Sequence, residues 1–314
     1  MMNTLLNVYY RLPHDRCFGI VSKAFNRLVA KFIKWILDRI VPAYFLKTQG
    51  HHPMGINTEK RDKEVIISFT SFPARIDDVW IVVECLLRQS YKADKIILWL
   101  SEPQFEEIEL PKLLLDQQKR GLEIRFVSED VRAHKKYLYA LQEYHHAYII
   151  TVDDDLYYDQ DLIENLVNLK VKYPNCIPTN RCHKITFSES GNIQPYSKWE
   201  HNSTILQPSF LLVPTGGFGT MYLNKQLDIN FSNRLIIQDL IPYADDLWMK
   251  VQSLLKETKI VTNQKYNKDP ITVKSSQLEK LVTKNVFDGG NDLQLRKVLD
   301  YFNLGNLEKY RQIK

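Results

Sequence analysis

Residues 148–155 read Tyr-Ile-Ile-Thr-Val-Asp-Asp-Asp, an apolar run rich in β-branched residues that ends in three adjacent carboxylates. Like charges repel, so a folded chain keeps such a cluster mainly where a cation offsets it. Carboxylate oxygens favour a hard divalent cation such as Mg²⁺ or Mn²⁺. A solvated acidic turn is the alternative, but the position directly behind a buried-type strand favours a metal site.

The same strand pattern recurs along the chain, separated by segments of helical periodicity. Segments with a strand pattern occur at 65–70, 95–100, 122–127 and 147–152. Helical patterns lie between and after them, at 77–88, 106–120, 134–144 and 159–173. This alternation predicts an α/β fold with a Rossmann-like, mostly parallel central sheet flanked by helices. Ligands bind beyond the carboxyl ends of such strands, where the acidic triplet (Asp153, Asp154 and Asp155) and the loop 68–75 lie.

Size and charge limit the possible functions. The chain has 314 residues, 44% of them hydrophobic, which suits one large α/β domain with appendages or two domains. The net charge is +7 over residues 1–63, −7 over 64–250 and +5 over 251–314. An acidic centre makes nucleic acid an unfavourable partner, and we expect none. The four scattered cysteines lack zinc-site spacing, which predicts reduced thiols in a cytoplasmic protein.

Residues 23–41 form an amphipathic pattern near the N-terminus. Apolar residues recur there at helical spacing, Lys and Arg occupy the other face, and Trp35 lies near the boundary. Such a helix can lie on an anionic membrane surface, or it can pack on its own domain with its basic face in water. No stretch reaches the roughly 20 apolar residues that span a bilayer. No signal-peptide pattern is present either, so we expect a cytoplasmic protein, peripheral on the inner face of the membrane if the first alternative holds.

Two further motifs carry groups suited to chemistry. Gly216-Gly-Phe-Gly219 is a glycine-rich turn, where missing Cβ atoms either allow close approach to a sugar or serve the turn alone. Asp245 and Asp246 form an acidic pair at the start of a predicted helix, where the macrodipole also favours negative charge. Within the triplet, strand alternation would place the first and third carboxylates on one side and the second on the other.

In order and spacing, these motifs resemble a bacterial nucleotide-sugar glycosyltransferase with the GT-A fold, including its Asp-x-Asp motif. The resemblance is carried by Thr70-Ser-Phe-Pro-Ala-Arg-Ile76, His134-Lys-Lys-Tyr137, Ile150-Thr-Val-Asp-Asp-Asp155, Pro214-Thr-Gly-Gly-Phe-Gly219 and Ala244-Asp-Asp-Leu-Trp248. It implies a GT-A-like catalytic domain over 64–265, with a nucleotide-binding half (64–155) and an acceptor half (156–265). A basic helical segment (1–63) would precede this domain and a helical tail (266–314) would follow it.

The resemblance also implies roles for individual residues. Asp155 is implied as the main ligand of Mn²⁺ or Mg²⁺, with Asp153 beside it on the metal or on the nucleotide ribose. Asp246 is implied as the base that accepts the proton of the acceptor hydroxyl, with Asp245 as its rival. The implied donor-binding residues are Thr70, Ser71, Phe72, Arg75, Lys135, Lys136, Asp153 and Asp154. The implied acceptor or sugar-binding residues are Gly216, Gly217, Phe218 and Trp248.

One feature departs from the family pattern. Many such enzymes add a His metal ligand near the C-terminus, whereas the last His of this chain is His201, before the acidic pair. Asp288 or Asp292 is the alternative source of a further ligand.

The predicted function is transfer of a sugar from a nucleoside diphosphate sugar, a UDP-sugar above all, to a glycan or lipid-linked acceptor in surface-polysaccharide synthesis. A non-catalytic peripheral membrane or glycan-binding protein on the same scaffold is the main alternative. A phosphatase with an Asp-x-Asp pair is a further one. That class requires Thr or Val two residues after the second Asp, however, and this chain has Tyr157 there.

Overall fold

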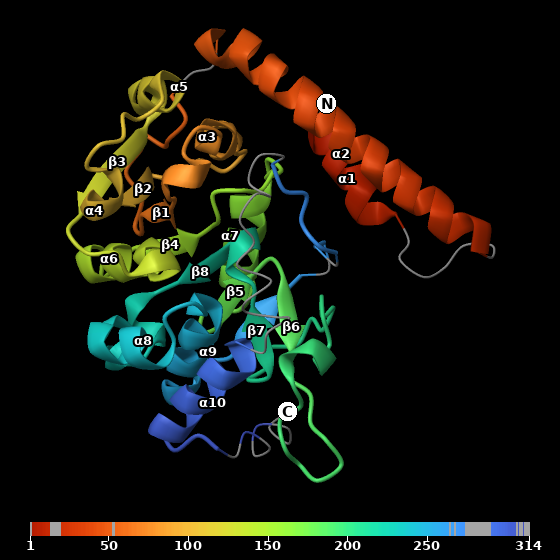
Figure 1. Ribbon diagram of the computed structural model, residues 1–314, viewed down its shortest axis with the longest axis vertical. Coiled ribbons are helices and arrows are strands. Elements are labelled where there is room, and N and C mark those ends of the chain that lie inside the picture. Colours follow the sequence, from red (N-terminus) through yellow and green to blue (C-terminus); the bar gives the residue numbers. More distant parts are fainter. Residues whose placement is uncertain are drawn as a thin grey trace.

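The computed structural model describes residues 2–12, 20–51, 54–263, 265–266, 268–273, 290–305, 307 and 310. A seven-stranded sheet at its centre has the order β3-β2-β1-β4-β8-β5-β9 (Figure 1). In that order, the strands span Leu122–Val127, Lys95–Ser101, Val65–Thr70, Tyr148–Thr151, Thr220–Tyr222, Ile177–Thr179 and Ile260–Thr262. Strand β8 is antiparallel to both neighbours, so the other strands of this sheet all point in one direction. The predicted α/β fold with a mostly parallel sheet is confirmed.

Helices cover both faces of the sheet, and each face has its own hydrophobic core. Val65, Ile67 and Phe69 of β1 belong to one core, whereas Ile66 belongs to the other. The first core includes side chains of α3 (Val79–Leu87) and α7 (Leu162–Lys172). The second includes side chains of α6 (Lys135–Glu143), α9 (Asp245–Leu255) and α10 (Gly290–Tyr301). Because both faces are buried, the central strands read as continuous apolar runs.

The order of the strands creates a switch point in the sheet. Strand β2 pairs with one side of β1 and β4 with the other, so the winding of the chain reverses between β1 and β4. Such a switch point leaves room for a ligand beyond the carboxyl ends of the two strands. The loop after β1 and the acidic triplet after β4 therefore meet at the place where an α/β sheet binds ligands.

The helix predicted over 106–120 was wrong in its extent. The chain forms α4 (Glu102–Phe105), then α5 (Lys112–Asp116) and a 3₁₀ turn (Gln117–Arg120). Pro111 lacks an amide hydrogen and disfavours helical backbone in the residue before it, so the helix begins after this proline. Further elements are α8 (Arg234–Leu240) and a small sheet of β6 (Cys182–Lys184) and β7 (Leu212–Pro214).

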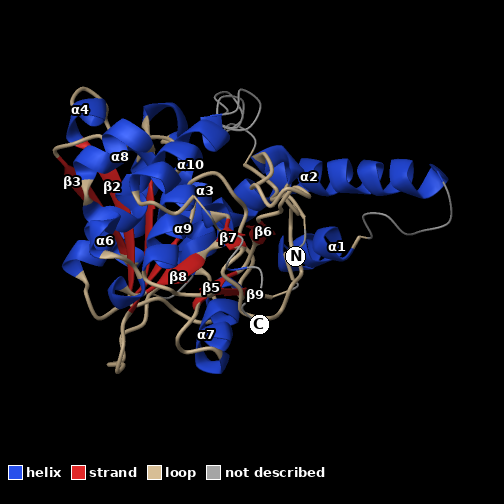
Figure 2. Cartoon of the chain, turned by 90° about the horizontal axis from the view of Figure 1, so that it is seen from below, coloured by secondary structure: helices blue, strands red, loops and turns tan. Residues whose placement is uncertain are grey.

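Two helices precede the sheet. Helix α1 (Met2–Arg11) packs against α2 (Ile20–Thr48), and α2 extends well beyond the body of the domain (Figure 2). The helix predicted over residues 23–41 is thereby confirmed. None of the helices in the described parts of the chain combines the length and the apolar character needed to cross a membrane.

Candidate active site

The acidic triplet lies just beyond β4, in a bend at the switch point. Asp154 is held from the loop after β1: its Oδ2 accepts a hydrogen bond from Ser71 Oγ at 2.5 Å, and Arg75 Nη1 lies 2.7 Å from its Oδ1. The same Nη1 lies 3.1 Å from Asp155 Oδ2. Strand alternation therefore does not extend through the triplet, because β4 ends at Thr151 and the following bend turns two neighbouring carboxylates toward one guanidinium.

Lys136 joins the triplet to the acidic pair. Its ammonium lies 2.9 Å from Asp153 Oδ1 and 2.7 Å from Asp245 Oδ2, and only 6% of its side chain is exposed. The neighbouring Lys135 is also buried but forms an ion pair with Asp130. The structure thus separates the two lysines that the sequence could not, and only Lys136 belongs to the site.

The glycine turn (Gly216 and Gly217) contacts both acidic groups. The amide of Gly216 donates to Asp246 Oδ1 at 2.9 Å. A Cβ atom on Gly216 would lie 2.5 Å from that oxygen, and one on Gly217 would lie 2.7 Å from Asp153 Oδ2. Both distances are shorter than a van der Waals contact. The missing side chains therefore let two carboxylates close on the turn from opposite ends of the site.

Replacing Gly217 by Ala is expected to displace Asp153 and to lower donor affinity, with a stability cost of about 1–3 kcal/mol from overpacking. Urea unfolding and titration with UDP would measure the two effects. Gly50→Ala is the matched control, because nothing lies within 4 Å of a Cβ atom at that position. Equal behaviour of the two variants would contradict the packing role of Gly217.

Tyr158 is a site residue that sequence reasoning missed. Its hydroxyl accepts a hydrogen bond from the amide of Asp153 at 2.9 Å and donates to the carbonyl of Gly217 at 2.6 Å. It is 1% exposed and so fixes the triplet against the glycine turn from inside the core. Because the turn is 59 residues away in sequence, only the tertiary structure reveals this role.

The charged groups of the site perturb one another strongly. Burial and the nearby Asp153 raise the pKa of Asp155 to about 7, against the lowering effect of Arg75. Burial and Asp245 raise the pKa of Asp246 to about 7, against the lowering effect of Lys136. Burial opposes the charge of Asp245 too, but Lys136 outweighs it, so the pKa of Asp245 lies below its usual value. The site therefore holds both an ion-paired carboxylate and carboxyl groups that are poised to titrate near neutrality.

Replacing Lys136 by Met is expected to lower the free energy of unfolding by about 3–5 kcal/mol at pH 7, because it leaves buried carboxylates without their cation. The pKa of Lys136 is raised well above its usual value, since the carboxylates outweigh its burial. Its contribution is therefore complete at neutral pH. The pKa of Asp245 is lowered, so the contribution fades when acid protonates that group below about pH 4.

Chemical denaturation at pH 7 and at pH 3.5 would measure this difference. Lys119→Met is the matched control, because Lys119 pairs with Asp116 while 79% of its side chain stays exposed, so little change is expected. A loss for Lys136→Met that is no larger than that of the control would contradict the bridging role.

Two residues predicted to bind sugar lie in the core instead. Phe218 is 2% exposed and packs against the rings of Tyr10 and Tyr266, with centroid distances of 5.9 and 5.0 Å. Trp248 is fully buried, and its Nε1 donates to the carbonyl of Phe231 at 2.9 Å. Neither ring offers a face to a ligand, so we no longer assign either to sugar binding.

The remaining predicted donor residues line the loop after β1. Thr70 Oγ1 donates to the carbonyl of Trp99 at 2.8 Å, which fixes the end of β1. The Phe72 ring lies 5.1 Å from the guanidinium carbon of Arg75. Nucleotide binding by this loop stays a prediction.

Aromatic and imidazole rings border the acidic pair. The hydroxyl of Tyr196 is close enough to Asp246 for the carboxylate, after burial, to raise the pKa of the tyrosine. The Tyr196 ring lies 5.8 Å from that of His183 and 5.7 Å from that of His201. The amide of Tyr196 donates to Asp292 Oδ1 at 2.7 Å, so Asp292 has a structural partner. Asp288 lies outside the described residues.

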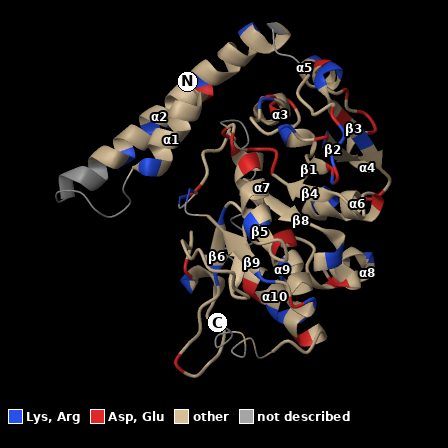
Figure 3. Ribbon diagram, turned by 180° about the vertical axis from the view of Figure 1, so that it is seen from behind, with Lys and Arg blue, Asp and Glu red and all other residues tan. Residues whose placement is uncertain are grey.

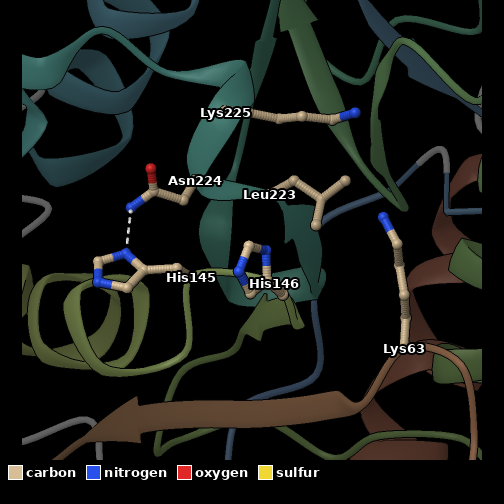
Figure 4. A pocket seen from close by; sticks show the side chains of 6 residues that line it. All are labelled: Lys63, His145, His146, Leu223, Asn224 and Lys225. Carbon is tan, nitrogen blue, oxygen red and sulfur yellow. Dashed lines mark hydrogen bonds between the residues drawn. The ribbon is translucent and has the colours of Figure 1, made fainter.

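A pocket of about 310 Å³ lies at the opposite, amino-terminal edge of the sheet, away from the triplet (Figure 4). Its lining contains two lysines and two histidines, and one contact within it joins His145 Nδ1 to Asn224 Nδ2 at 3.4 Å. The lining residues are Lys63, His145, His146, Leu223, Asn224 and Lys225. None of them was predicted as a site residue, and none carries a carboxylate.

Comparison with known proteins leaves the chain without an assigned family. No protein-family model matches it, and no curated protein sequence does. Many solved structures resemble part of the chain, among them the following two. CMP:2-keto-3-deoxy-manno-octonic acid synthetase complexed with CTP is 11% identical with a TM-score of 0.40, over 64% of this chain and 89% of that one. S. aureus TarS 1–349 is 14% identical with a TM-score of 0.43, over 75% of this chain and 65% of that one. These likenesses are too distant to identify a function.

Proposed function

We propose that the chain is a metal-dependent glycosyltransferase that moves a sugar from a nucleoside diphosphate sugar to a hydroxyl group of an acceptor. The observation that carries the proposal is the meeting of two acidic groups at the switch point of the sheet, with Lys136 between them. One group, the triplet, follows a central strand, and the other, the acidic pair, begins α9. An inverting transferase uses both: one group to hold the cation that binds a diphosphate and one to take a proton.

The triplet fits a divalent cation that takes only one or two of its ligands from the protein. Among the described residues, no cluster of three or more Asp, Glu, His and Cys side chains has the geometry of a complete metal site. Mg²⁺ is commonly held by only one or two carboxylates, with phosphates and water completing its shell. The pKa of Asp155 is raised first by burial and then by repulsion from Asp153, and a cation would relieve that repulsion. Asp155 and Asp153 are therefore the residues that would hold Mn²⁺ or Mg²⁺, which when bound neutralises charge on the leaving diphosphate.

The acidic pair supplies the proposed base. Asp246 accepts the proton of the acceptor hydroxyl while the hydroxyl oxygen bonds to the anomeric carbon and the bond to the diphosphate breaks. Its pKa near 7 suits a base that works at neutral pH. The Gly216 amide orients its carboxylate, whereas Asp245 is held by Lys136 at 2.7 Å and is less free to take a proton. This contrast favours Asp246 over Asp245.

The donor side is proposed from the loop after β1 and from Lys136. Arg75 and Lys136 place two cationic groups beside the triplet, where a pyrophosphate would lie. Following the family resemblance, we propose a UDP-sugar as the donor and a glycan or lipid-linked acceptor in surface-polysaccharide synthesis.

Calorimetric titration with UDP, with and without Mn²⁺, tests the proposal. We expect Mn²⁺ to tighten UDP binding at least about ten-fold, since a cation held by Asp155 and Asp153 would offset the charge of the diphosphate. Slow hydrolysis of a UDP-sugar, measured on the same protein, separates a transferase from a non-catalytic binding protein, which would show none. Folded protein without metal-linked UDP binding would overturn the proposed function.

A further inference from the structure

Helix α2 has two apolar faces on opposite sides. One face is buried at a spacing of four residues and holds the helix to the domain; it comprises Ile33 (2% exposed), Leu37 (0%), Val41 (0%) and Phe45 (1%). The other is exposed at spacings of three and four residues; it comprises Phe25 (62%), Leu28 (65%), Phe32 (59%) and Trp35 (51%). Each residue turns an α-helix by about 100°, so the two stripes point in nearly opposite directions. Packing on the domain thus explains one face and leaves the other unpartnered among the described residues.

The exposed face is large and continuous. The rings of Phe32 and Trp35 stack with a centroid distance of 6.0 Å, and the guanidinium carbon of Arg39 lies 5.2 Å from the Trp35 ring. This part of α2 projects beyond the body of the domain (Figure 2). A contiguous exposed patch of large apolar side chains marks an interaction surface rather than ordinary surface composition.

The charge of α2 indicates the partner. The helix carries six Lys or Arg residues and a single acidic residue, Asp38 (Figure 3). Asp38 is used within the protein: Lys34 pairs with it at 3.4 Å, and the Tyr157 hydroxyl donates to it at 3.3 Å. Arg27, Lys31 and Arg39 stay exposed near the apolar stripe. Large apolar and aromatic side chains beside Lys and Arg, with almost no acidic groups, match an anionic lipid surface.

We propose that α2 docks in the plane of an anionic lipid bilayer, with Phe25, Leu28, Phe32 and Trp35 inserted between the lipid headgroups. The exposed basic side chains then lie against the lipid phosphates. The opposite face stays on the protein, so the helix both binds the membrane and carries the domain. Of the two alternatives that the sequence left open for residues 23–41, packing on the domain describes one face, and the proposal assigns the other face to the membrane.

The docking helix is tied to the acidic site. Lys34 Nζ donates to the carbonyl of Thr272 at 2.5 Å. Thr272 forms a β-bridge with Leu156, and the next amide, of Val273, donates to the carbonyl of Asp155 at 2.8 Å. The helix thus reaches the backbone of the triplet through residues 272–273. If the proposed function holds, docking would keep the site beside the surface that presents a lipid-linked acceptor.

Trp35 provides a specific measurement with the intact chain. The other tryptophans, Trp80, Trp99, Trp199 and Trp248, are each at most 6% exposed, so quenching by brominated lipids reports on Trp35. Vesicles containing brominated lipid and about 30 mol% phosphatidylglycerol are expected to bind the protein and quench its fluorescence. Vesicles of phosphatidylcholine alone are not. Trp35→Phe should remove the quenching while the protein still sediments with anionic vesicles.

Matched variants separate docking through α2 from nonspecific binding to vesicles. Phe32→Glu is expected to weaken sedimentation with anionic vesicles at least about thirty-fold, since it removes a buried aromatic group. Leu235→Glu makes a comparable change on α8, where Leu235 is 80% exposed, and should have no effect. The double change Arg27→Gln and Lys31→Gln should weaken binding about thirty-fold and reduce its salt dependence.

Three outcomes would overturn the proposal: no binding to anionic vesicles, equal binding by Phe32→Glu, or a concentration-dependent dimer that Phe32→Glu abolishes in the absence of vesicle binding. The last outcome would identify a second copy of the chain as the partner. UDP binding by Phe32→Glu should match that of the unchanged protein. A failure of docking and a failure of the proposed function are therefore distinguishable.

Discussion

Asp246→Asn is expected to lower turnover about 10³-fold while leaving the affinity for UDP nearly unchanged, because a general base contributes roughly 10²–10⁴-fold. The substitution removes the basic oxygen but retains a carbonyl oxygen that can accept the hydrogen bond of the Gly216 amide, now 2.9 Å long. Lys136, which bridges the acidic pair and the triplet, pairs with Asp245 rather than with Asp246, so the donor side keeps its ion pairs. Initial-rate kinetics and calorimetry on the same preparation would measure both quantities.

The pH dependence provides a second signature of the same residue. The base must be ionised, so kcat/KM is expected to rise with pH through an apparent pKa near 7, the value to which burial and Asp245 raise Asp246. The effect on stability has the opposite sign. A carboxyl group whose pKa is higher in the folded state favours folding when protonated, so its contribution declines from about pH 4 to about pH 7. Asp246→Asn should remove the part of both dependences that this residue causes, while Asp155, whose pKa is also raised to about 7, keeps its own part.

Asp245→Asn is the matched control. It breaks the 2.7 Å ion pair with Lys136 and should therefore lower stability as well as turnover. Asp246→Asn breaks no ion pair within the part of the chain that the structure describes, so it should lower turnover alone. Turnover of Asp246→Asn within ten-fold of the unchanged protein would exclude this residue as the base.

The sequence alone was enough to predict those strands and motifs that depend on residues close together in the chain. Strands β1 and β3 begin and end where the sequence predicted. Strand β1 lies inside the sheet and is buried along nearly its whole length, whereas the edge strand β3 leaves Phe126 exposed. The triplet, the acidic pair and the glycine turn were also visible, since each is a short run of one residue type. The helix over 106–120 was predicted wrongly, because the effect of Pro111 outweighed an otherwise helical pattern.

The assembly of the site depended on contacts between distant parts of the chain. Lys135 and Lys136 are adjacent in sequence, yet one pairs with Asp130 and the other bridges Asp153 and Asp245. The direction of a side chain at the start of α6 is set by packing, which no local pattern encodes. For the same reason the sequence suggested sugar contacts for Phe218 and Trp248, although both rings fill the core. The sequence of a glycine-rich turn, or of a helix that begins near a Trp, is the same whether the ring binds a sugar or fills the core.

Asp155→Asn is expected to abolish the effect of Mn²⁺ on UDP binding. Mutation of a residue that only supports a metal ligand commonly lowers metal affinity about 10–100-fold. Loss of a direct carboxylate ligand should therefore lower the affinity for Mn²⁺ by about 100-fold or more. The fold should survive, because the change removes one of several repelling charges and Arg75 keeps its 2.7 Å contact with Asp154. Thermal unfolding of the variant at or above the midpoint of the unchanged protein would confirm that point.

The same measurement has a pH dependence with a defined sign. Protons compete with a metal for a carboxylate, and burial and Asp153 raise the pKa of Asp155 to about 7. Mn²⁺-linked UDP binding should therefore strengthen as pH rises from 6 to 8, and this trend should vanish in Asp155→Asn. Asp130→Asn is a suitable control, because Asp130 pairs with Lys135 outside the site and its loss should leave the metal effect intact. If Mn²⁺ still tightens UDP binding in Asp155→Asn as it does in the control, the triplet is not a metal site, and the acidic groups at this edge of the sheet need a different explanation.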